Sequence, residues 1–378
     1  MDRDYITPLL SPEEIERINT SPRRDRNHPL NQFLFPQQNK SEVYYNTNRA
    51  LRYISQDNSA WLQSIKSRLC NIDDYSAPVS ALGEIRAFGY LLSANLNVAA
   101  IPESDESSPD FKVEHNNKTI IIETHCKQYD SREARALADF NNESIQYPER
   151  GGVIVREHGV TPFGRPGREE NVAENVISRL TQIKQEEHQF NTKDHCILWL
   201  DFQDTVWYLT MNKDRACPIN TFRGELYAGE IWYSLYGYPG LPIFEGETPG
   251  LRGIRHTVRM RHKGRFSNNS KIDAIVYSFP RSTIVFENIF SKKPIPFWFW
   301  ELFVNVPWFQ YEYSRMNWPA NKLRKAILID LSTIKAFDRM LENKDNKFIN
   351  HFSNIVEKLK GIYSCIIVRI KNYKRIIY

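Results

Sequence analysis

Two acidic residues, Asp110 and Glu123, flank a short segment whose pattern predicts a β-hairpin. Apolar and polar side chains alternate in PDFKVEH, residues 109–115, and Asn116 and Asn117 then offer two residues that tolerate positive φ. The return strand, TIIIETHCK, is rich in β-branched residues. If the asparagines are the central residues of the turn, 115 faces 118, 113 faces 120, 111 faces 122, and Asp110 faces Glu123.

Opposed carboxylates on one face of a hairpin repel each other unless a positive charge lies between them, because their Cβ atoms are roughly 5 Å apart. A hard divalent cation, Mg²⁺ or its common substitute Mn²⁺, takes one or two carboxylates as ligands together with water and substrate phosphate. Because strand side chains alternate, His125 and Lys127 share the face of Glu123 and add a proton acceptor and a permanent cation. These residue types predict a metal-dependent hydrolytic site.

The elements expected around this hairpin form an α/β unit. Residues 80–95, SALGEIRAFGYLLSAN, carry apolar side chains at helical spacing, and residues 97–101 are expected to form a short strand. After the hairpin, residues 171–190 carry one apolar stripe, typical of a helix, and the runs HCILWLDF and TVWYLTM indicate buried strands. The expected order is α-β-β-β-α-β. Two further strands are expected at IDAIVYSF and STIVFEN.

The runs GEIRAFGYL, SPDF and IIIETHCK resemble the PD-(D/E)XK nuclease superfamily of restriction-endonuclease-like proteins, over about residues 80 to 210. The resemblance implies a restriction-endonuclease-like α-β-β-β-α-β core with a mixed central sheet. It also implies that Asp110 and Glu123 are metal ligands, that Glu84 on the first helix is a further acidic contributor, and that the backbone carbonyl of Thr124 is an additional ligand.

The chain departs from that family at the lysine, which belongs two residues after the glutamate. His125 occupies this position, and Lys127 follows two residues later. Either Lys127 reaches back to orient the nucleophile, or His125 has taken the part of the lysine, or the site is inactive. The resemblance further implies that the second helix contributes polar residues near the site, for which Lys184 and Gln185 are candidates by position.

The distribution of residue types along the chain suggests three parts. Residues 1–75 are expected to be an N-terminal extension, with a helix at 12–18 behind a Ser11 cap and another at about 46–68. Residues 76–305 would form the nuclease-like core, interrupted at about 216–271 by a region rich in Gly, Pro and Tyr. Residues 306–378 would form a helical tail that ends in a strand-like run, SCIIVRI.

Composition is that of a folded protein with a mildly basic balance. The chain has 378 residues and a formal net charge of +5, which permits a nucleic-acid partner without requiring one. Five dispersed cysteines without a C-x-x-C pair argue against a disulfide scaffold and a zinc site. The N-terminus lacks a signal-peptide pattern, and the apolar run 297–306 is too short and interrupted to span a membrane. We therefore expect a cytoplasmic protein that buries this run in its core.

A basic stretch, RGIRHTVRMRHKGR, is the expected nucleic-acid-binding segment. It contains six Lys or Arg residues and no acid: Arg252, Arg255, Arg259, Arg261, Lys263 and Arg265. Contact with phosphates is the natural use of such a cluster, and a solvated surface is the alternative. The aromatic residues that precede it, among them Trp232, Tyr233 and Tyr236, are expected to pack in the core rather than to stack on bases.

These patterns lead to the expectation of a Mg²⁺-dependent endonuclease that hydrolyses phosphodiester bonds in DNA, in a restriction or host-defence role. The long additions to the core could form recognition surfaces or the interface of a homodimer or other protein partner. One alternative is an inactive nuclease-fold protein that binds nucleic acid or a protein. A second is a nuclease directed at RNA, since nothing in the motif reads the 2′-hydroxyl. No P-loop motif accompanies the site, so a motor function would require a partner.

Overall fold

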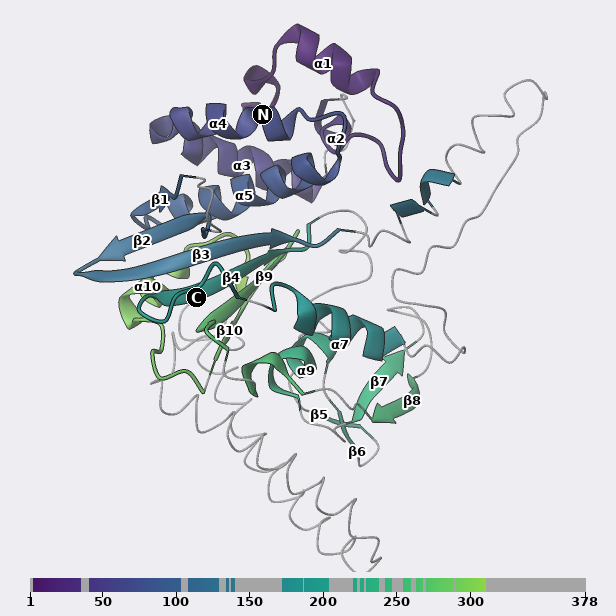
Figure 1. The fold of residues 1–378 in the computed structure, drawn as a ribbon, viewed down its shortest axis with the longest axis vertical. Helices are drawn as coiled ribbons and strands as arrows, with labels where there is room; N and C mark the ends of the chain where they lie inside the picture. The colour runs from purple at the N-terminus through teal and green to yellow at the C-terminus, as the bar shows by residue number, and fades with distance from the viewer. Residues whose placement is uncertain are drawn as a thin grey trace, which may run out of the picture.

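A mixed β-sheet lies between two layers of helices in the computed structural model of the chain (Figure 1). The structure describes residues 3–34, 41–102, 108–128, 134–135, 137–139, 172–185, 187–203, 220–222, 225–227, 229–237, 242–246, 254–259, 263–267, 270–288 and 290–310. The predicted α/β class with a mixed central sheet is confirmed, as is the α-β-β-β-α-β order of elements. The expected strand at residues 205–211 and the tail from residue 311 onward lie outside the described residues.

The sheet has seven strands in the spatial order β1-β2-β3-β4-β9-β10-β11. The first two pairings differ from the next two: β1–β2 and β2–β3 are antiparallel, whereas β3–β4 and β4–β9 are parallel. Strand β10 then runs antiparallel to β9 and parallel to β11. The strand bounds are Val98–Ala100 (β1), Phe111–His115 (β2), Lys118–Cys126 (β3), His195–Asp201 (β4), Ala274–Phe279 (β9), Ser282–Glu287 (β10) and Phe309–Gln310 (β11).

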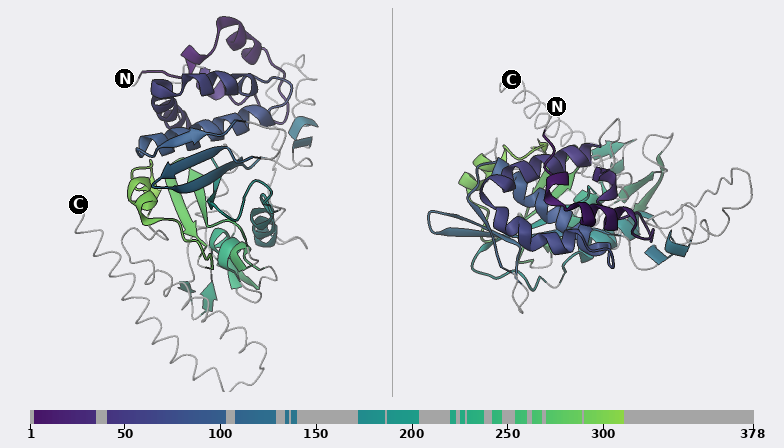
Figure 2. Two further views of the ribbon diagram at one scale, coloured as in Figure 1. Left: turned by 60° about the vertical axis from the view of Figure 1, so that its left-hand side comes forward. Right: turned by 90° about the horizontal axis from the view of Figure 1, so that it is seen from above.

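The N-terminal helices and α5 cover one face of this sheet (Figure 2). Their bounds are Thr7–Leu9 (η1), Pro12–Asn19 (α1), Asn31–Leu34 (α2), Glu42–Asp57 (α3), Ser59–Leu69 (α4) and Ser76–Ser93 (α5). Ser11 caps α1 through a capping box with Glu14, as its sequence predicts. The single helix expected at about 46–68 is instead two helices, α3 and α4, which meet at Asn58 with φ −128°.

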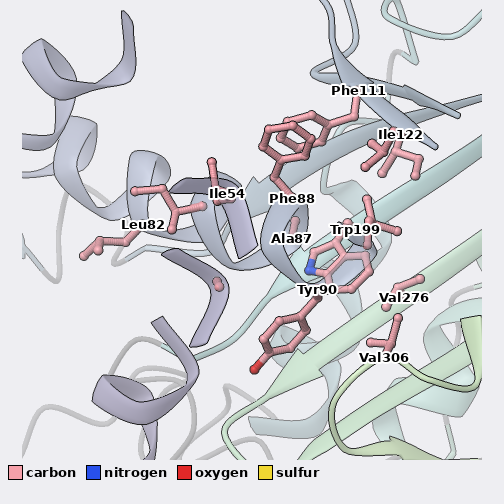
Figure 3. Packing of buried hydrophobic residues seen from close by; sticks show 14 of the residues in the cluster. Ile54, Leu82, Ala87, Phe88, Tyr90, Phe111, Ile122, Trp199, Val276 and Val306 are labelled. Atoms are coloured by element: carbon pink, nitrogen blue, oxygen red, sulfur yellow. The ribbon is translucent and has the colours of Figure 1, made fainter. Parts of the chain in front are cut away.

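Large aromatic side chains fill the core between α5 and the sheet. Phe88 of α5 stacks on Phe111 of β2, with ring centroids 4.9 Å apart, and Trp61 of α4 contacts both rings edge-on. Figure 3 shows this stack beside Ile122 of β3 and Trp199 of β4. Apolar residues of α1 to α4 belong to the same buried cluster, in which α5 lies against the sheet, α3 and α4 pack on α5, and α1 lies farther from the sheet (Figure 1). The stack fixes the start of β2, which immediately follows Asp110.

Helices α7 (Val172–Gln182) and α9 (Glu230–Tyr236) cover the opposite face of the sheet (Figure 1). The predicted core packing of Trp232, Tyr233 and Tyr236 is confirmed, since all three are buried there. The other elements of this part are short: β5 (Asn220–Phe222), β6 (Glu225–Tyr227), β7 (Pro242–Gly246), β8 (Ile254–Arg259) and η3 (Arg265–Ser267).

The apolar run 297–306 forms helix α10, Phe297–Phe303, and buries Phe299, Trp300 and Phe303 in the core on the α5 side of the sheet. The predicted core packing of this run is thereby confirmed, although Phe297 is half exposed. None of the helices in the described ranges is long and apolar enough to cross a membrane.

The hairpin β2–β3 has the predicted register. Phe111 pairs with Ile122, Val113 with Ile120, and His115 with Lys118. Asn116 and Asn117 form the turn with φ of 48° and 60°, the left-handed conformation that a two-residue hairpin turn requires. The alternation of side chains along β3 then directs Ile120 and Ile122 into the α5 layer, and Ile121 into the α7 layer.

Because Asn117 is left-handed, replacing it with alanine is expected to lower the free energy of unfolding by about 1 kcal/mol, the cost of placing a Cβ-bearing residue without a compensating side chain in that conformation. Asn117→Gly is the matched control and should leave the free energy unchanged or slightly raised. Urea denaturation of the three proteins measures the difference. Equal stability of the alanine and glycine variants would contradict the turn geometry.

Candidate functional site

Asp110 and Glu123 lie at the end of the hairpin that is distant from its turn. Extending the observed register by one pair beyond Phe111 and Ile122 places them opposite each other. Asp110 immediately precedes β2, where its own carbonyl accepts a hydrogen bond from Ile101 N at 2.9 Å. Its carboxylate Oδ2 accepts a second bond from Thr124 N of β3 at 2.6 Å. The predicted pairing of the two acidic residues is therefore consistent with direct contacts between their strands.

Glu123 is the buried member of the pair, with 4% of its surface exposed. Its Oε1 lies 2.7 Å from Nζ of Lys184, and its Oε2 is buried without a hydrogen-bond partner among the described residues. A buried carboxylate oxygen without a partner is costly, because it has lost its hydration. This oxygen is the feature of the site that most needs a ligand.

Lys184 comes from the turn that follows α7, and its side chain is about one quarter exposed, at 28%. Lys184, a candidate by its position alone, thus contacts Glu123. Its backbone is left-handed, with φ 50°, which a residue with a Cβ adopts only when its surroundings hold it there. The other positional candidate, Gln185, donates its backbone N–H to the carbonyl of Gln182.

Glu84 is also buried, but it has a partner of its own. Both of its carboxylate oxygens bind the Arg68 guanidinium of α4, at 2.9 Å and 2.6 Å. The helix approaches β3 closely here, since a Cβ on the preceding residue, Gly83, would collide with Sγ of Cys126. Arg86, two residues further along α5, makes a buried two-bond ion pair with Asp201.

The acidic groups influence one another's ionisation. Burial raises the pKa of Asp110 well above its ordinary value, and the negative charges of Glu123 and Glu84 raise it further, against the lowering effects of Thr124 N–H and Lys184. Burial likewise raises the pKa of Glu123, with a further contribution from Glu84, although its hydrogen bond and ion pair with Lys184 oppose that shift. The carboxylates thus disfavour one another's charged forms, and a bound divalent cation would relieve this repulsion.

His125 lies on β3 two residues after Glu123, and Lys127 follows the last residue of that strand, Cys126. Burial lowers the pKa of His125 to about 3, and the positive charges of Lys184, Lys127 and Arg265 act in the same direction. An imidazole with this pKa is neutral at physiological pH and holds a proton poorly. Lys127 is partly exposed near the end of the strand. It is Lys184, rather than either of these residues, that makes the ion pair with Glu123.

The predicted metal-binding set is only partly assembled. Among the described residues, no three His, Cys, Asp or Glu side chains form a group that could hold a metal ion. Glu84 is bonded to Arg68, so the two carboxylates of the hairpin are the available acidic ligands. Two carboxylates with water and phosphate are an ordinary set for Mg²⁺. Thr124, whose carbonyl was the remaining candidate ligand, is buried and donates its N–H to Asp110.

No family model, curated protein or solved structure matches this chain.

The basic stretch divides into parts with different surroundings. Arg255 and Arg259 lie on β8, and Lys263 is exposed, whereas Arg252 and Arg261 are outside the described residues. Arg265 does not fit the predicted role, because it is 4% exposed and its guanidinium binds Glu187 and two backbone carbonyls. The pattern of charges could not reveal this burial, since the partners lie far away in the sequence.

Asp110→Asn is expected to make the unfolding free energy less dependent on pH. The pKa of Asp110 is raised in the folded state, so its favourable contribution is fully present below the unfolded pKa of about 3.9 and is lost as pH rises through the folded pKa. In a chelating buffer, the variant should therefore be more stable than wild type at mildly alkaline pH, with a smaller difference near pH about 4.

Chemical denaturation across this pH range measures the effect, with Asp194→Asn as the control, because Asp194 is distant from the hairpin end and bonds Asn191. Added Mg²⁺ should stabilise wild type and not Asp110→Asn. If the unfolding free energy of wild type rose with pH as steeply as that of Asp110→Asn, the raised pKa of Asp110 would be contradicted.

Proposed function

We propose that the protein is a divalent-metal-dependent nuclease that hydrolyses phosphodiester bonds in DNA, with Asp110, Glu123 and Lys184 at its active centre. The observation that carries this proposal is the environment of Glu123. One oxygen of this buried carboxylate binds Lys184, and the other has no partner among the described residues, beside a second carboxylate on Asp110. A buried acidic pair with an adjacent lysine suits phosphodiester hydrolysis better than it suits stability.

The fold is compatible with the proposed nuclease function. The α/β class and the mixed sheet are compatible with the restriction-endonuclease-like core that the sequence resembles, and this compatibility supports the proposal. The lysine is the difference. It comes from the turn after α7 instead of from β3, so His125 can occupy the usual lysine position without removing a cation from the site.

The residues of the chain divide the work between binding and charge stabilisation. Asp110 and Glu123 would hold the metal ion, which when bound supplies a Lewis acid and an activated water. The Thr124 amide fixes the Asp110 carboxylate by a hydrogen bond. Lys184 brings a positive charge to the pair, where it would stabilise the negative charge that develops on the phosphate. Neutral His125 would remain beside the reacting groups as a hydrogen-bonding group instead of a cation.

The proposal is tested by incubating the protein with supercoiled plasmid in Mg²⁺, in Mn²⁺ and in a chelator, with a single-stranded RNA in parallel. Nicked or linear DNA in the metal-containing reactions alone is the expected result. Cleavage of RNA and not DNA would transfer the activity to the other substrate. If neither substrate is cut and calorimetry detects no divalent-ion binding, the inactive nuclease-fold protein that binds nucleic acid or a protein partner becomes the better description.

A further inference from the structure

The turn that presents Lys184 has a strained backbone. Helix α7 ends at Gln182, and both Lys184 and Glu187 are left-handed, with φ of 50° and 51°. Each such residue costs about 1 kcal/mol or more relative to an ordinary conformation. Neither is a glycine or an asparagine, so the local sequence offers no reason for this path. Contacts from elsewhere in the fold must hold it.

Arg265 of η3 supplies these contacts from one side. Its guanidinium donates to the carbonyl oxygens of Ile183 and Lys184, the latter at 2.7 Å, and to Oε1 of Glu187 at 3.2 Å. The last carbonyl groups of a helix lack partners within the helix and favour a positive charge, so an arginine there both satisfies and stabilises them. A single side chain therefore binds the backbone of Lys184 and the residues on both sides of it.

Glu187 fastens the turn from the other side. Its carboxylate accepts hydrogen bonds from Ser270 Oγ and from Lys271 N, each at 2.6 Å, in addition to the bond from Arg265. It is 8% exposed, so the ion pair with Arg265 is buried. Breaking a buried ion pair by removing one partner is strongly destabilising, whereas a buried pair adds little stability over an apolar one. A role in fixing geometry explains the pair better than a role in stability.

We propose that Arg265 and Glu187 form a clasp that positions Lys184 on Glu123, an inference that rests on the proposed function for its catalytic meaning. The clasp consists of Arg265, Glu187, Ser270 and Lys271. Three of these residues come from one segment, residues 263–271 without the undescribed 268–269, which begins within the basic stretch. This segment contacts the catalytic lysine through the backbone carbonyl of Lys184. Arg265 is thus a positioning residue instead of a phosphate contact.

The test measures the exposure of Lys184 directly. Trace acetylation of lysines, followed by mass spectrometry of the peptides, reports how accessible each amine is, and an ammonium bonded to a buried carboxylate reacts slowly. In Arg265→Lys the guanidinium fork is lost while the charge remains. We expect acetylation of Lys184 to accelerate at least severalfold, while Lys66 and Lys112, which make ion pairs elsewhere, keep their wild-type rates.

Two further variants separate positioning from general loosening. Glu187→Gln keeps the size of the side chain and one acceptor oxygen, which can still accept the bond from Lys271 N, while the charge that Arg265 pairs with is lost. This variant should also expose Lys184, and it keeps the test open if Arg265→Lys does not fold. Arg86→Lys makes the same change in a buried ion pair elsewhere, with Asp201, and should leave Lys184 at its wild-type rate. An unchanged Lys184 rate in folded Arg265→Lys and Glu187→Gln would overturn the clasp, and so would equal acceleration at all three lysines.

Plasmid cleavage by the same variants distinguishes this inference from the proposed function. A clasp that positions a catalytic lysine should lower kcat about a hundredfold in Arg265→Lys and leave KM nearly unchanged, because substrate binding does not use the clasp. Faster acetylation in a protein that cuts no nucleic acid would support the clasp and refute the nuclease. If wild type cuts DNA but Lys184 is acetylated at the same rate in all variants, the nuclease is supported and the clasp is refuted.

Discussion

Replacing Glu123 with glutamine is expected to reduce metal-dependent cleavage of DNA by about a thousandfold or more, which corresponds to about 4 kcal/mol of transition-state stabilisation. Glutamine has the shape of glutamate but no charge, and its amide is a poor ligand for a hard cation. Its carbonyl can still accept the bond from Lys184, so the turn after α7 has no reason to move. Loss of activity in a folded protein would therefore report loss of the metal ligand.

Glu114→Gln is the matched control for this experiment. Glu114 lies on β2 of the same hairpin, is exposed, and makes its ion pair with Lys112 at 3.0 Å. The control variant should cut plasmid at the wild-type rate and bind Mg²⁺ with wild-type affinity, whereas Glu123→Gln should show neither activity nor measurable binding by calorimetry. A Glu123→Gln protein that cuts at a rate close to wild type would remove this carboxylate from the active centre.

The hairpin could be predicted from sequence because its geometry is local. Once Asn116 and Asn117 are assigned to the turn, every pair along β2 and β3 follows by counting, and the opposition of Asp110 and Glu123 follows with it. The helical stripe and the buried strands of the core could also be predicted, since each depends on a periodicity within one segment. The boundary between α3 and α4 was missed, because the apolar pattern continues through Asn58.

The third member of the site could not be predicted in the same way. Alternation predicts that His125 and Lys127 share the face of Glu123, but burial decides what His125 can do, and it leaves His125 neutral. Lys184 reaches the site through a left-handed turn, and nothing in its own sequence predicts that conformation. A resemblance of the second helix to a family pattern could name Lys184 only as one of two candidates.

Buried charge pairs explain most of the remaining differences. Arg265 and Arg68 have ordinary sequence surroundings for solvated surface residues, yet each binds a buried carboxylate from another element. The acidic partners, Glu187 and Glu84, are no easier to recognise. Sequence patterns show where charges gather along the chain, whereas the pairing of charges across the fold depends on the packing of helices and loops. Functional sites concentrate such pairs, so they are the part of the molecule that pattern reading describes least well.

Lys184→Met is expected to lower cleavage by about a hundredfold or more, through loss of the positive charge that would stabilise the phosphate in the transition state. The same change should increase the affinity for Mg²⁺ in mildly alkaline buffer. The ammonium of Lys184 binds Oε1 of Glu123 in wild type and repels an incoming cation, so its removal leaves both oxygens of the carboxylate available. Plasmid assays and calorimetry on one preparation measure the two effects.

Lys127→Met is the comparison that decides which lysine serves the site. Lys127 lies two residues beyond His125, just after the end of β3, and its substitution removes the same charge from a partly exposed position. If Lys184 fills the lysine role, Lys127→Met should retain most of the activity and should leave the affinity for Mg²⁺ unchanged. A larger loss in Lys127→Met than in Lys184→Met would return the role to the strand. Equal and small losses in both would mean that the carboxylate pair acts without either lysine.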